Sequence, residues 1–337
     1  MKGHFTARLP LKTLLAFVLL VLLATAGYCA IYVVSPLEVG TLPAEVEIPR
    51  GAGFRAALAA LEKGGIRLQR RQFELLARAL GQSRGIKAGN YQFAERPTPL
   101  ELLQKLNRGD VTQAELRLIE GWTFGQFRAL LNASPDLRHE TAAMDDAQIL
   151  AALKAAEPHP EGLFFPDTYL FARGSSDLAV LRAAYHAMQR HLQAEWEGRE
   201  EGVPYRSPYE ALIMASIVEK ETGLAAERDL VAGALVNRLR LGMRLQVDPT
   251  IIYGLGDAFD GNLKKRHLLE DGPYNTYTRA GLPPSPIAMP GFAALHAALH
   301  PAKTDALYYV SRGDGSSHFS PNIREHNRAV TRYQLKR

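Results

Sequence analysis

Hydrophobic residues form two uninterrupted runs in this chain, one near the N-terminus and one in its second half. The first run, residues 14–34, contains no charged side chain and reaches the roughly 20 apolar residues that a helix needs to cross a bilayer. It is longer than the apolar core of a signal peptide, which spans about 7–15 residues. We therefore interpret it as a permanent transmembrane helix rather than a cleaved leader. The chain's single cysteine, Cys29, lies inside it, so no internal disulfide can form.

Charges beside the first run predict which way it crosses the membrane. The basic residues that precede it are Lys2, Arg8 and Lys12. Positively charged flanks stay on the cytoplasmic side. We therefore expect a cytoplasmic tail at residues 1–13, a single span through the bacterial inner membrane at residues 14–34, and a periplasmic remainder.

The second run, residues 211–218, lies in a segment with clear helix signals. Ser207 can cap the helix, a proline suits its first position, and Glu210 completes a capping box. Gly223 marks the end, so the pattern predicts a helix at residues 208–222. A helix that is apolar on all sides is typical of a protein core.

Glu219 directly follows the second run, one turn before the predicted helix end. A carboxyl group at the edge of a core loses solvation, and this raises its pKa. A raised carboxyl pKa is what a general acid needs near neutral pH. The alternative is a structural carboxylate paired with an Arg or Lys. Glu221, two positions later, faces elsewhere on the helix, and we expect it to be solvated or ion-paired.

Residues 35–157 alternate between strand-like and helix-like patterns, separated by Gly and Pro turns. The predicted strands are 45–49, 87–93 and 117–120, and the predicted helices are 54–63, 70–80, 99–107, 123–133 and 142–157. The first strand, two helices and second strand give a βααβ order that resembles a small peptidoglycan-binding LysM-like module. A spacer domain without a ligand has the same pattern, so both interpretations stay open.

A cluster of Pro and Gly at residues 158–162 interrupts the helical pattern and predicts a boundary between residues 35–157 and a second domain at 158–337. In the second domain, helices are predicted at 177–198, 208–222 and 225–241, and strands at 307–310 and 318–320. Asp167 is expected to cap helix-like residues that follow it or to support a site. Together the elements predict an α+β protein whose second domain is mixed α/β around the apolar helix.

The connections between residues 243 and 291 are rich in Pro, Gly, Tyr, Asn and Gln. Functional residues are frequent on such loops. Tyrosine faces and amide side chains suit sugar rings and their hydroxyl groups. The alternative is that the prolines only make long connections rigid.

Other chemistries find little support in the sequence. The net charge of +5 is spread out and forms no basic cluster with interleaved aromatics, so we expect no nucleic-acid partner. There is no Gly-x-Ser-x-Gly nucleophile elbow. His296 and His300 have a spacing that zinc ligands can have on a helix, but the glutamate that zinc hydrolases place between them is missing. We therefore expect no metal and no organic cofactor.

Several motifs become specific when they are taken together. They are Ala215-Ser-Ile-Val-Glu-Lys-Glu-Thr, Asn237-Arg-Leu, Gly242-Met-Arg-Leu-Gln-x-Asp-Pro-Thr, Tyr274-Asn-Thr-Tyr, Gly281-Leu-Pro-Pro, Tyr308-Tyr-Val and Glu161-Gly-x-x-Phe-Pro-Asp-Thr-Tyr. With these motifs, the anchor and the LysM-like region, nearly the whole chain resembles the endolytic murein transglycosylase (YceG-like) family. The resemblance implies an inner-membrane lyase that cuts within peptidoglycan strands, leaves 1,6-anhydromuramic acid ends and so terminates strand elongation. It also implies peptidoglycan synthases as candidate partners.

The resemblance identifies Glu219, the first glutamate of the Glu-Lys-Glu-Thr motif, as the catalytic residue. We expect substrate contacts from Glu221, Gln246, Asp248, Tyr274, Asn275 and Tyr277. Hydrolytic glycosidases usually need two carboxylates. A lytic enzyme needs only one, because the substrate's own C6 hydroxyl replaces water as the nucleophile.

Two other functions stay open at this point. A hydrolytic muramidase would use Asp248 or Asp167 as a second carboxylate, and its product would be one water heavier. A peptidoglycan-binding scaffold for wall synthases would leave the glycan strands unchanged.

Overall fold

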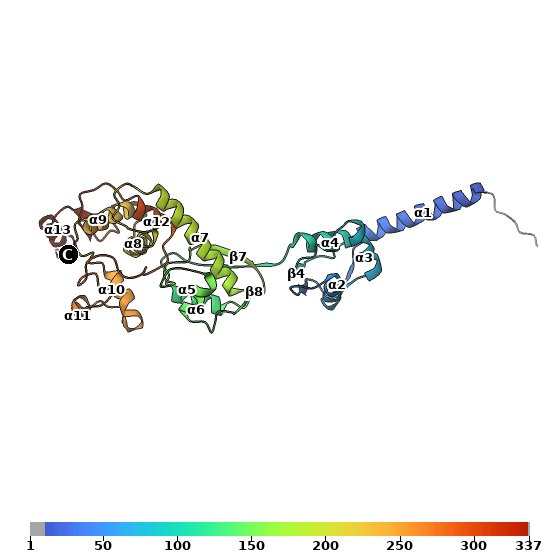
Figure 1. The fold of residues 1–337 in the computed structure, drawn as a ribbon, viewed down its shortest axis with the longest axis horizontal. Helices are drawn as coiled ribbons and strands as arrows, with labels where there is room; N and C mark the ends of the chain where they lie inside the picture. Colours follow the sequence, from blue (N-terminus) through green and yellow to red (C-terminus); the bar gives the residue numbers. More distant parts are fainter. Residues whose placement is uncertain (1–10, 336–337) are drawn as a thin grey trace, which may run out of the picture. The chain divides into compact units, whose positions relative to one another are not determined.

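The computed structural model describes residues 11–335, so residues 1–10 of the predicted tail lie outside the described part (Figure 1). The chain divides into two compact units. Unit 1 comprises Met1–Ala114 and Ala172–Gly174, and unit 2 comprises Glu115–Phe171 and Ser175–Arg337. Both units contain helices and short two-stranded sheets, which agrees with the predicted mixture of α and β structure.

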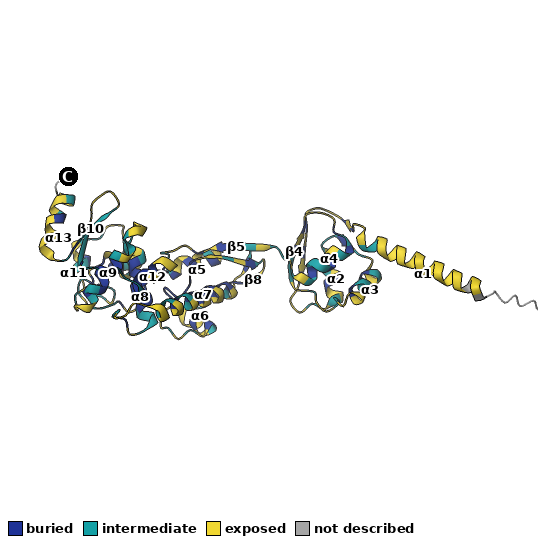
Figure 2. Cartoon of the chain, turned by 90° about the horizontal axis from the view of Figure 1, so that it is seen from above, coloured by how far each residue is buried: buried dark blue, intermediate teal, exposed yellow. Residues whose placement is uncertain are grey.

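Unit 1 begins with a long apolar helix, α1 (Leu11–Val34). Within it, Leu15–Val34 is long and apolar enough to cross a membrane, and none of this stretch is buried (Figure 2). The side chains of Leu20 and Leu23 are 65% and 63% exposed. Exposure of such residues to water is unfavourable, whereas lipid tails would match them. The helix is therefore compatible with the predicted single span.

The rest of unit 1 is a small α/β fold. Its elements are β1 (Glu38–Val39), β2 (Ala44–Ile48), α2 (Phe54–Lys63), β3 (Ile66–Arg67), α3 (Arg70–Ala79), β4 (Gly89–Phe93) and α4 (Pro99–Arg108). Strand β2 pairs antiparallel with β4, and β1 pairs antiparallel with β3. Buried and exposed residues alternate along β2, so one of its faces covers a core that includes Phe73, Tyr91 and Leu102.

The predicted βααβ order is present as β2, α2, α3 and β4, with β3 as an addition between the two helices. Helix α2 has the predicted bounds. Thr98 caps α4, and its side chain and that of Glu101 form a reciprocal capping box. Local signals were therefore sufficient for most of this unit.

Unit 2 contains most of the helices. They are α5 (Phe124–Ala133), α6 (Asp146–Leu153), α7 (Asp177–Gly198), α8 (Pro208–Glu221), α9 (Arg228–Arg240), α10 (Asp248–Leu255), α11 (Lys265–Leu269), α12 (Phe292–Leu299) and α13 (Ile323–Val330), with short turns η1 (Ala225–Glu227), η2 (Gly256–Ala258) and η3 (Thr331–Leu335). The strand pairs are β5 (Gln113–Arg117) with β7 (Thr168–Ala172), β6 (Leu137–Arg138) with β8 (Ser175–Ser176), and β9 (Tyr308–Ser311) with β10 (Ser317–Ser320).

Helix α8 forms the centre of unit 2, as the apolar run predicts. Every residue from Ala211 to Val218 is buried, and the helix packs against α7, α9, α10 and α12 (Figures 1 and 2). Leu212, Ile217 and Val218 are completely buried. Each such side chain contributes roughly 1.5–3 kcal/mol through removal of apolar surface from water. The core thus fixes the position of the polar residues that follow at the end of α8.

The boundary between the units differs from the one predicted at residue 157. It falls after Ala114, and the Pro158–Gly162 segment lies within unit 2. Residues before that segment pack on residues after it. The buried carboxylate of Asp177 accepts hydrogen bonds from the backbone and hydroxyl of Thr141, and the ring of Phe124 stacks on Phe164 at 5.1 Å. These contacts join elements far apart in sequence, which local turn signals do not report.

Three predicted elements of unit 2 also change. Strand β5 ends at Arg117, before most of the predicted strand 117–120. Helix α6 is shorter than the predicted helix 142–157, because Asp145 caps it and Lys154 ends it in a left-handed conformation. The residues after Asp167 form strand β7 rather than a helix, because β7 pairs with the distant β5. Asp167 itself is exposed and accepts a hydrogen bond from the Thr168 N–H at 2.7 Å.

Candidate active site

Helix α8 carries two glutamates at its C-terminal end. Hydrogen bonds at its start help to hold the helix, and so the glutamates, in place. The Ser207 hydroxyl accepts a hydrogen bond from the Glu210 N–H at 3.3 Å. The Glu210 carboxylate accepts from the Arg206 N–H rather than from that of Ser207, so the predicted capping box is shifted by one residue. The helix ends where the Thr222 N–H donates to the Val218 carbonyl.

Two loops pair beside Glu219. The Gly121 N–H donates to the Met289 carbonyl at 2.9 Å, and the Met289 N–H donates to the Trp122 carbonyl at 2.8 Å. This pairing brings Gly291 to the end of α8, where its N–H donates to Oε2 of Glu219 at 3.1 Å. Gly291 is the residue that precedes α12. Glu219 therefore lies at a helix N-terminus, where a negative charge is favoured.

Two glycines lie in the loops beside Glu219, and each has a glutamate side chain next to it. A Cβ on Gly291 would lie 1.9 Å from Oε1 of Glu120, so the carboxylate of Glu120 covers this glycine. Gly121 has a φ of +76° and lies against Glu219, with 3.8 Å between an added Cβ and Cγ of Glu219. The Lys220 ammonium donates to the Gly121 carbonyl at 3.2 Å. Glu219 thus has two kinds of neighbour: the carboxylate of Glu120, and the turn at Gly121 that is hydrogen-bonded to Lys220.

The surroundings of Glu219 suit a group that cycles between two protonation states. Partial burial raises its pKa, and the charge of Glu120 raises it further. The Gly291 N–H opposes this shift because it favours the carboxylate, and the positive charges of Arg228 and Lys220 act in the same direction. The acid form is therefore favoured more than in water, and the carboxylate form keeps a donor.

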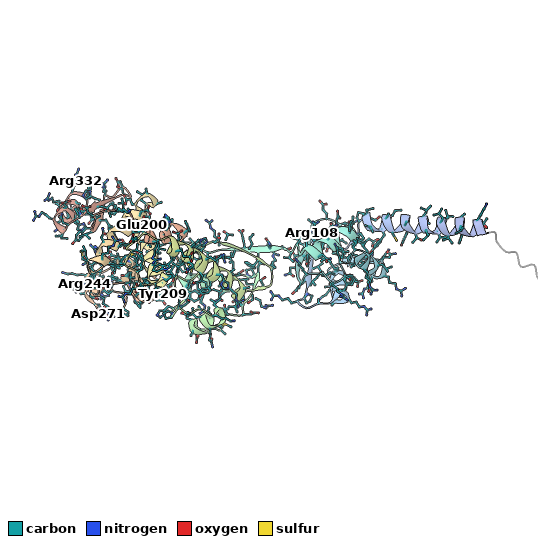
Figure 3. The ribbon with its side chains drawn as sticks, turned by 45° about the horizontal axis from the view of Figure 1, so that its top comes forward. Arg108, Glu200, Tyr209, Arg244, Asp271 and Arg332 are labelled. Atoms are coloured by element: carbon teal, nitrogen blue, oxygen red, sulfur yellow. The ribbon has the colours of Figure 1, made fainter. Side chains whose placement is uncertain are left out.

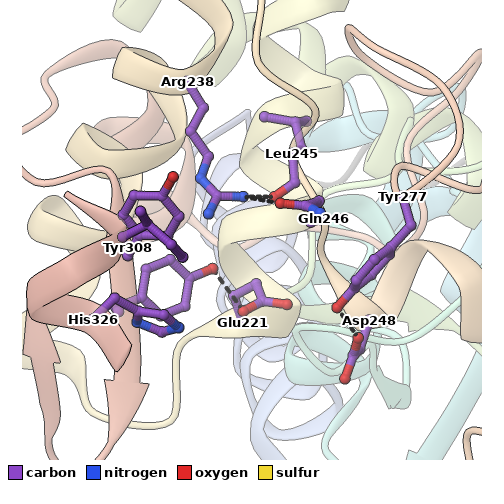
Figure 4. Close-up of a pocket in the computed structure, with 10 residues that line it drawn as sticks. Glu221, Arg238, Leu245, Gln246, Asp248, Tyr277, Tyr308 and His326 are labelled. Atoms are coloured by element: carbon purple, nitrogen blue, oxygen red, sulfur yellow. Dashed lines mark hydrogen bonds between the residues drawn. The ribbon is translucent and has the colours of Figure 1, made fainter. Parts of the chain in front are cut away.

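Glu221 faces a separate pocket of about 390 Å³ (Figure 4). Its carboxylate accepts a hydrogen bond from the Tyr309 hydroxyl at 2.8 Å. Across the pocket, the Tyr277 hydroxyl donates to Oδ1 of Asp248 at 2.6 Å. The Arg238 guanidinium holds the wall by donating to the Leu245 carbonyl at 2.6 Å. The pocket is therefore built from α8, α9, the start of α10, the 273–277 loop and the C-terminal hairpin.

The pocket also contains a carboxyl group with a raised pKa. Burial raises the pKa of Glu221 to about 7, although the Tyr309 hydroxyl and Arg238 lower it, because desolvation is the larger effect. The negative charge of Asp248 raises this pKa further. Gln246 lines the same pocket with a φ of +53°, a conformation that non-glycine residues seldom adopt outside functional sites and tight turns.

The structure brings together four of the six residues expected to contact substrate. Of these six, the four that line the pocket are Glu221, Gln246, Asp248 and Tyr277. Tyr274 points elsewhere, where its hydroxyl bonds to that of Ser285 at 2.7 Å. Asn275 is buried, and its amide donates to the His267 and Glu270 carbonyls. Its geometry is that of a residue that shapes the loop.

A model of the YceG-like family matches residues 46–332, which is most of the chain. The chain belongs to the YceG-like family. It is 31% identical to a Bacillus subtilis protein named endolytic murein transglycosylase, over 86% of this chain and 84% of that protein. A Streptococcus pneumoniae protein of the same name is 26% identical, and the chain covers 58% of its length. A crystal structure of a YceG-like protein from Listeria monocytogenes is 30% identical and superposes with a TM-score of 0.55, covering 84% of this chain and 97% of that one.

Sequence reasoning gave no site role to three neighbours of the two glutamates. Glu120 and Gly291 adjoin Glu219, and Tyr309 binds Glu221. The sequence separation in the last pair is 88 residues, so no local pattern could join them. Gly291 carries one usable signal, because it follows Met289-Pro290 directly before a helical pattern, as a glycine at a helix N-cap does.

Glu161, the first residue of the Glu-Gly-x-x-Phe-Pro-Asp-Thr-Tyr motif, is a further buried carboxyl group in unit 2, and the sequence analysis gave it no site role. Burial raises its pKa to about 7, and the Phe124 N–H and the Tyr253 hydroxyl donate to it. Its side-chain hydrogen bonds go to the start of α5 and to α10, and it is not among the residues that line the pocket of Glu221. We therefore assign it to the packing of α5 and α10.

Proposed function

We propose that this chain cuts murein glycan strands internally, with Glu219 as its single acid–base residue. The chain is a lytic transglycosylase, as its family and the names of its relatives indicate. The observation that supports Glu219 is its place at the edge of a buried helix, with a backbone donor on its carboxylate and a neighbouring carboxylate that promotes its acid form. This combination suits proton donation followed by proton recovery.

The chemistry requires two proton transfers at one carboxyl group. Protonated Glu219 gives its proton to the glycosidic oxygen while the bond to the anomeric carbon of N-acetylmuramic acid breaks. The C6 hydroxyl of the same sugar then attacks that carbon, and the Glu219 carboxylate takes its proton. The products are a free N-acetylglucosamine hydroxyl and a 1,6-anhydro ring, so no water is consumed. Between the two steps, the Gly291 N–H and the N-terminus of α12 stabilise the carboxylate.

The pocket of Glu221 is proposed to hold neighbouring sugars of the strand. Tyr277 and Tyr308 offer aromatic faces, and Gln246 and Asp248 offer hydrogen-bonding groups. The catalytic region then comprises residues 158–337 together with the loop that carries Glu120. No metal or organic cofactor enters this reaction.

The remaining parts are proposed to place the reaction at the membrane. Helix α1 would anchor the chain with residues 1–13 in the cytoplasm and the rest in the periplasm. The LysM-like fold of unit 1 would bind glycan strands as they emerge from peptidoglycan synthases, so that cleavage ends strand elongation. The largely exposed apolar surface of α1 and the βααβ order of unit 1 support this arrangement.

Product mass tests the proposal directly. The full chain, purified in detergent, is incubated with uncrosslinked glycan strands, and the fragments are analysed by mass spectrometry. We expect internal cleavage with anhydro ends. Ends that are one water heavier would identify a hydrolase, for which Glu120 rather than Asp248 or Asp167 is the carboxylate beside Glu219. Unchanged strands would identify a scaffold.

A further inference from the structure

Three potential metal ligands meet where α7 packs on α12, away from the contacts of Glu219. Nδ1 of His296 lies 2.8 Å from Oε2 of Glu195, and Nε2 of His300 lies 3.4 Å from the same oxygen. The two imidazole rings are stacked at 4.4 Å with an angle of 24° between their planes. The three ligand atoms all lie within 4.8 Å of one another. The separation of 101 residues between Glu195 and His296 explains why the sequence did not indicate this group.

The spacing of these atoms fits a tetrahedral zinc ion with small adjustments. Zinc bonds to nitrogen and carboxylate oxygen measure about 2.0–2.2 Å, so ligand atoms in a tetrahedron lie about 3.4 Å apart. Two of the pairs lie at 2.8 and 3.4 Å, and the third lies within 4.8 Å. Rotation of the exposed His296 side chain can close the third pair without backbone movement, because this side chain is 50% exposed.

The charge balance also favours a cation. The side chain of Glu195 is only 13% exposed, and a carboxylate that is largely removed from water needs a positive partner. The two histidines supply positive charge only when they are protonated, whereas a divalent ion supplies both charge and coordination. The exposure of His296 leaves a path for the ion and an open position for water as a fourth ligand.

We propose that Glu195, His296 and His300 form a binding site for Zn²⁺. This site goes beyond the proposed glycan cleavage and does not depend on it. The sequence-based expectation of no metal considered only a glutamate between the two histidines, whereas α7 supplies the carboxylate from another helix. Two histidines and one carboxylate are a donor set that zinc favours, while Mg²⁺ and Ca²⁺ prefer oxygen ligands alone.

A bound ion would join two helices at the point where the chain already connects them once. Glu200, labelled in Figure 3, follows α7, and its N–H donates to the Leu299 carbonyl of α12 at 2.9 Å. Helix α12 begins directly after Gly291, which donates to Glu219. The ion would therefore add a second link between α7 and α12. Because it binds only the folded chain, it would also stabilise the folded state.

The test uses the full chain in detergent, without a histidine tag and stripped of metal. Isothermal titration calorimetry with Zn²⁺ is expected to show one ion per chain, and Co²⁺ is expected to give the visible absorption of a four-coordinate site. His296→Gln and Glu195→Gln are each expected to raise the dissociation constant at least roughly 10- to 100-fold. Zn²⁺ is expected to raise the melting temperature of the unaltered chain and not that of these variants.

The matched control is His186→Gln, an exposed histidine on α7 roughly 13 Å along the helix from Glu195. It should leave Zn²⁺ affinity unchanged, and Mg²⁺ should not compete. Circular dichroism of each variant separates lost ligands from lost folding, and a double variant His296→Asn/His300→Asn provides a second measure if one substitution unfolds. Absence of binding by the folded unaltered chain, or equal affinity in the His296, Glu195 and His186 variants, would overturn the proposal.

Discussion

Glu219 and Glu221 lie two residues apart on α8, yet their surroundings have little in common. Two residues correspond to roughly 200° around a helix, so the carboxyl groups face opposite sides. Glu219 lies against paired backbone loops and accepts a hydrogen bond from an N–H group. Glu221 lies in a side-chain pocket and accepts from a phenol hydroxyl, with Asp248 among its charged neighbours. The pKa of each is raised by burial.

The difference shows that a raised pKa alone does not mark the reacting group. An acid–base residue must be stable in both protonation states. When Glu219 loses its proton, the Gly291 N–H, Arg228 and Lys220 favour the resulting carboxylate, and the charge of Glu120 opposes it. When Glu221 loses its proton, Tyr309 and Arg238 favour the carboxylate, but the charge of Asp248 opposes it. We therefore propose proton transfer for the first face of α8, where the donor is a backbone N–H at a helix N-terminus, and sugar binding for the second, where the carboxyl group lines a pocket.

The largest expected effect is that of Glu219→Gln. The amide keeps the size of the side chain and can accept from Gly291, but it has no transferable proton. General acid–base catalysis contributes roughly 10²–10⁴-fold, and one residue here supplies both transfers, so the rate should fall by at least the upper end of that range. The measurement is formation of anhydro ends by the full chain on uncrosslinked strands. Because an amide avoids burial of charge, the melting temperature should be equal or slightly higher.

Near-normal rates for folded Glu219→Gln would remove this residue from the mechanism and make the two faces of α8 equivalent. The matched control is Glu210→Gln at the start of the same helix. It alters a capping interaction with Arg206 and lies far from the loops that adjoin Glu219, so it should change stability rather than rate.

Glu221→Gln should have a much smaller effect. The amide oxygen can still accept from the Tyr309 hydroxyl, so the pocket keeps its shape. We expect kcat to remain within roughly tenfold of the unaltered value and KM to rise more than kcat falls, as for a binding contact. Steady-state kinetics on strands of defined length measure both. A loss as large as that of Glu219→Gln would show that both faces act in the chemical step.

The elements around this site could be predicted where local signals decide them. The cap Ser207 is a sequence feature, and α8 begins directly after it at Pro208, as predicted. Helix α7 has the predicted bounds, because its apolar stripe and its termini are all local. The buried character of α8 follows from eight consecutive apolar or small residues, of which all are buried.

Contacts between distant segments could not be predicted in the same way. The strand after Asp167 exists because of its partner β5, and this partner overrides the local preference. The position of Glu120 beside Glu219 depends on the pairing of two loops that lie far apart in the chain. Among the residues expected to contact substrate, the sequence could not tell those that line the pocket from those that shape the loop. Asn275 and Tyr277 are two positions apart, but only Tyr277 lines the pocket.

Glu120→Gln should shift the pH profile rather than abolish activity. The Glu120 charge raises the pKa of Glu219, so its removal lowers that pKa. A general acid is active when protonated, and activity therefore declines as pH rises through its pKa. We expect the basic limb of the kcat profile to move to lower pH by less than about one unit, because Glu120 is exposed and its field is screened. Glu120→Lys should move the limb further in the same direction. An unchanged limb in both variants would show that the two carboxyl groups are not coupled.

Glu161→Gln is expected to leave the rate unchanged and to alter only the pH dependence of stability, which separates a raised pKa from a catalytic role. In the folded chain the pKa of Glu161 is about 7, above its ordinary value of 4.5. The folded state then binds the proton more tightly than the unfolded state, so stability falls as pH rises from about 4.5 to 7. A pKa difference of this size corresponds to about 3 kcal/mol, and Gln removes that penalty.

The measurement is urea unfolding of Glu161→Gln and of the unaltered chain at pH 4.5 and pH 8, with Glu197→Gln as an exposed control on α7. The variant should gain stability relative to the unaltered chain as the pH rises, by up to about 3 kcal/mol, because the raised pKa of Glu161 lowers the stability of the unaltered chain over this range and the amide does not titrate. The control should show no such change. A relative loss of stability at pH 8 would mean that the ionised carboxylate is the form that the fold prefers. In that case burial would not be the dominant influence on Glu161, and the same reasoning for Glu221, whose pKa is raised by the same cause, would have to be revised.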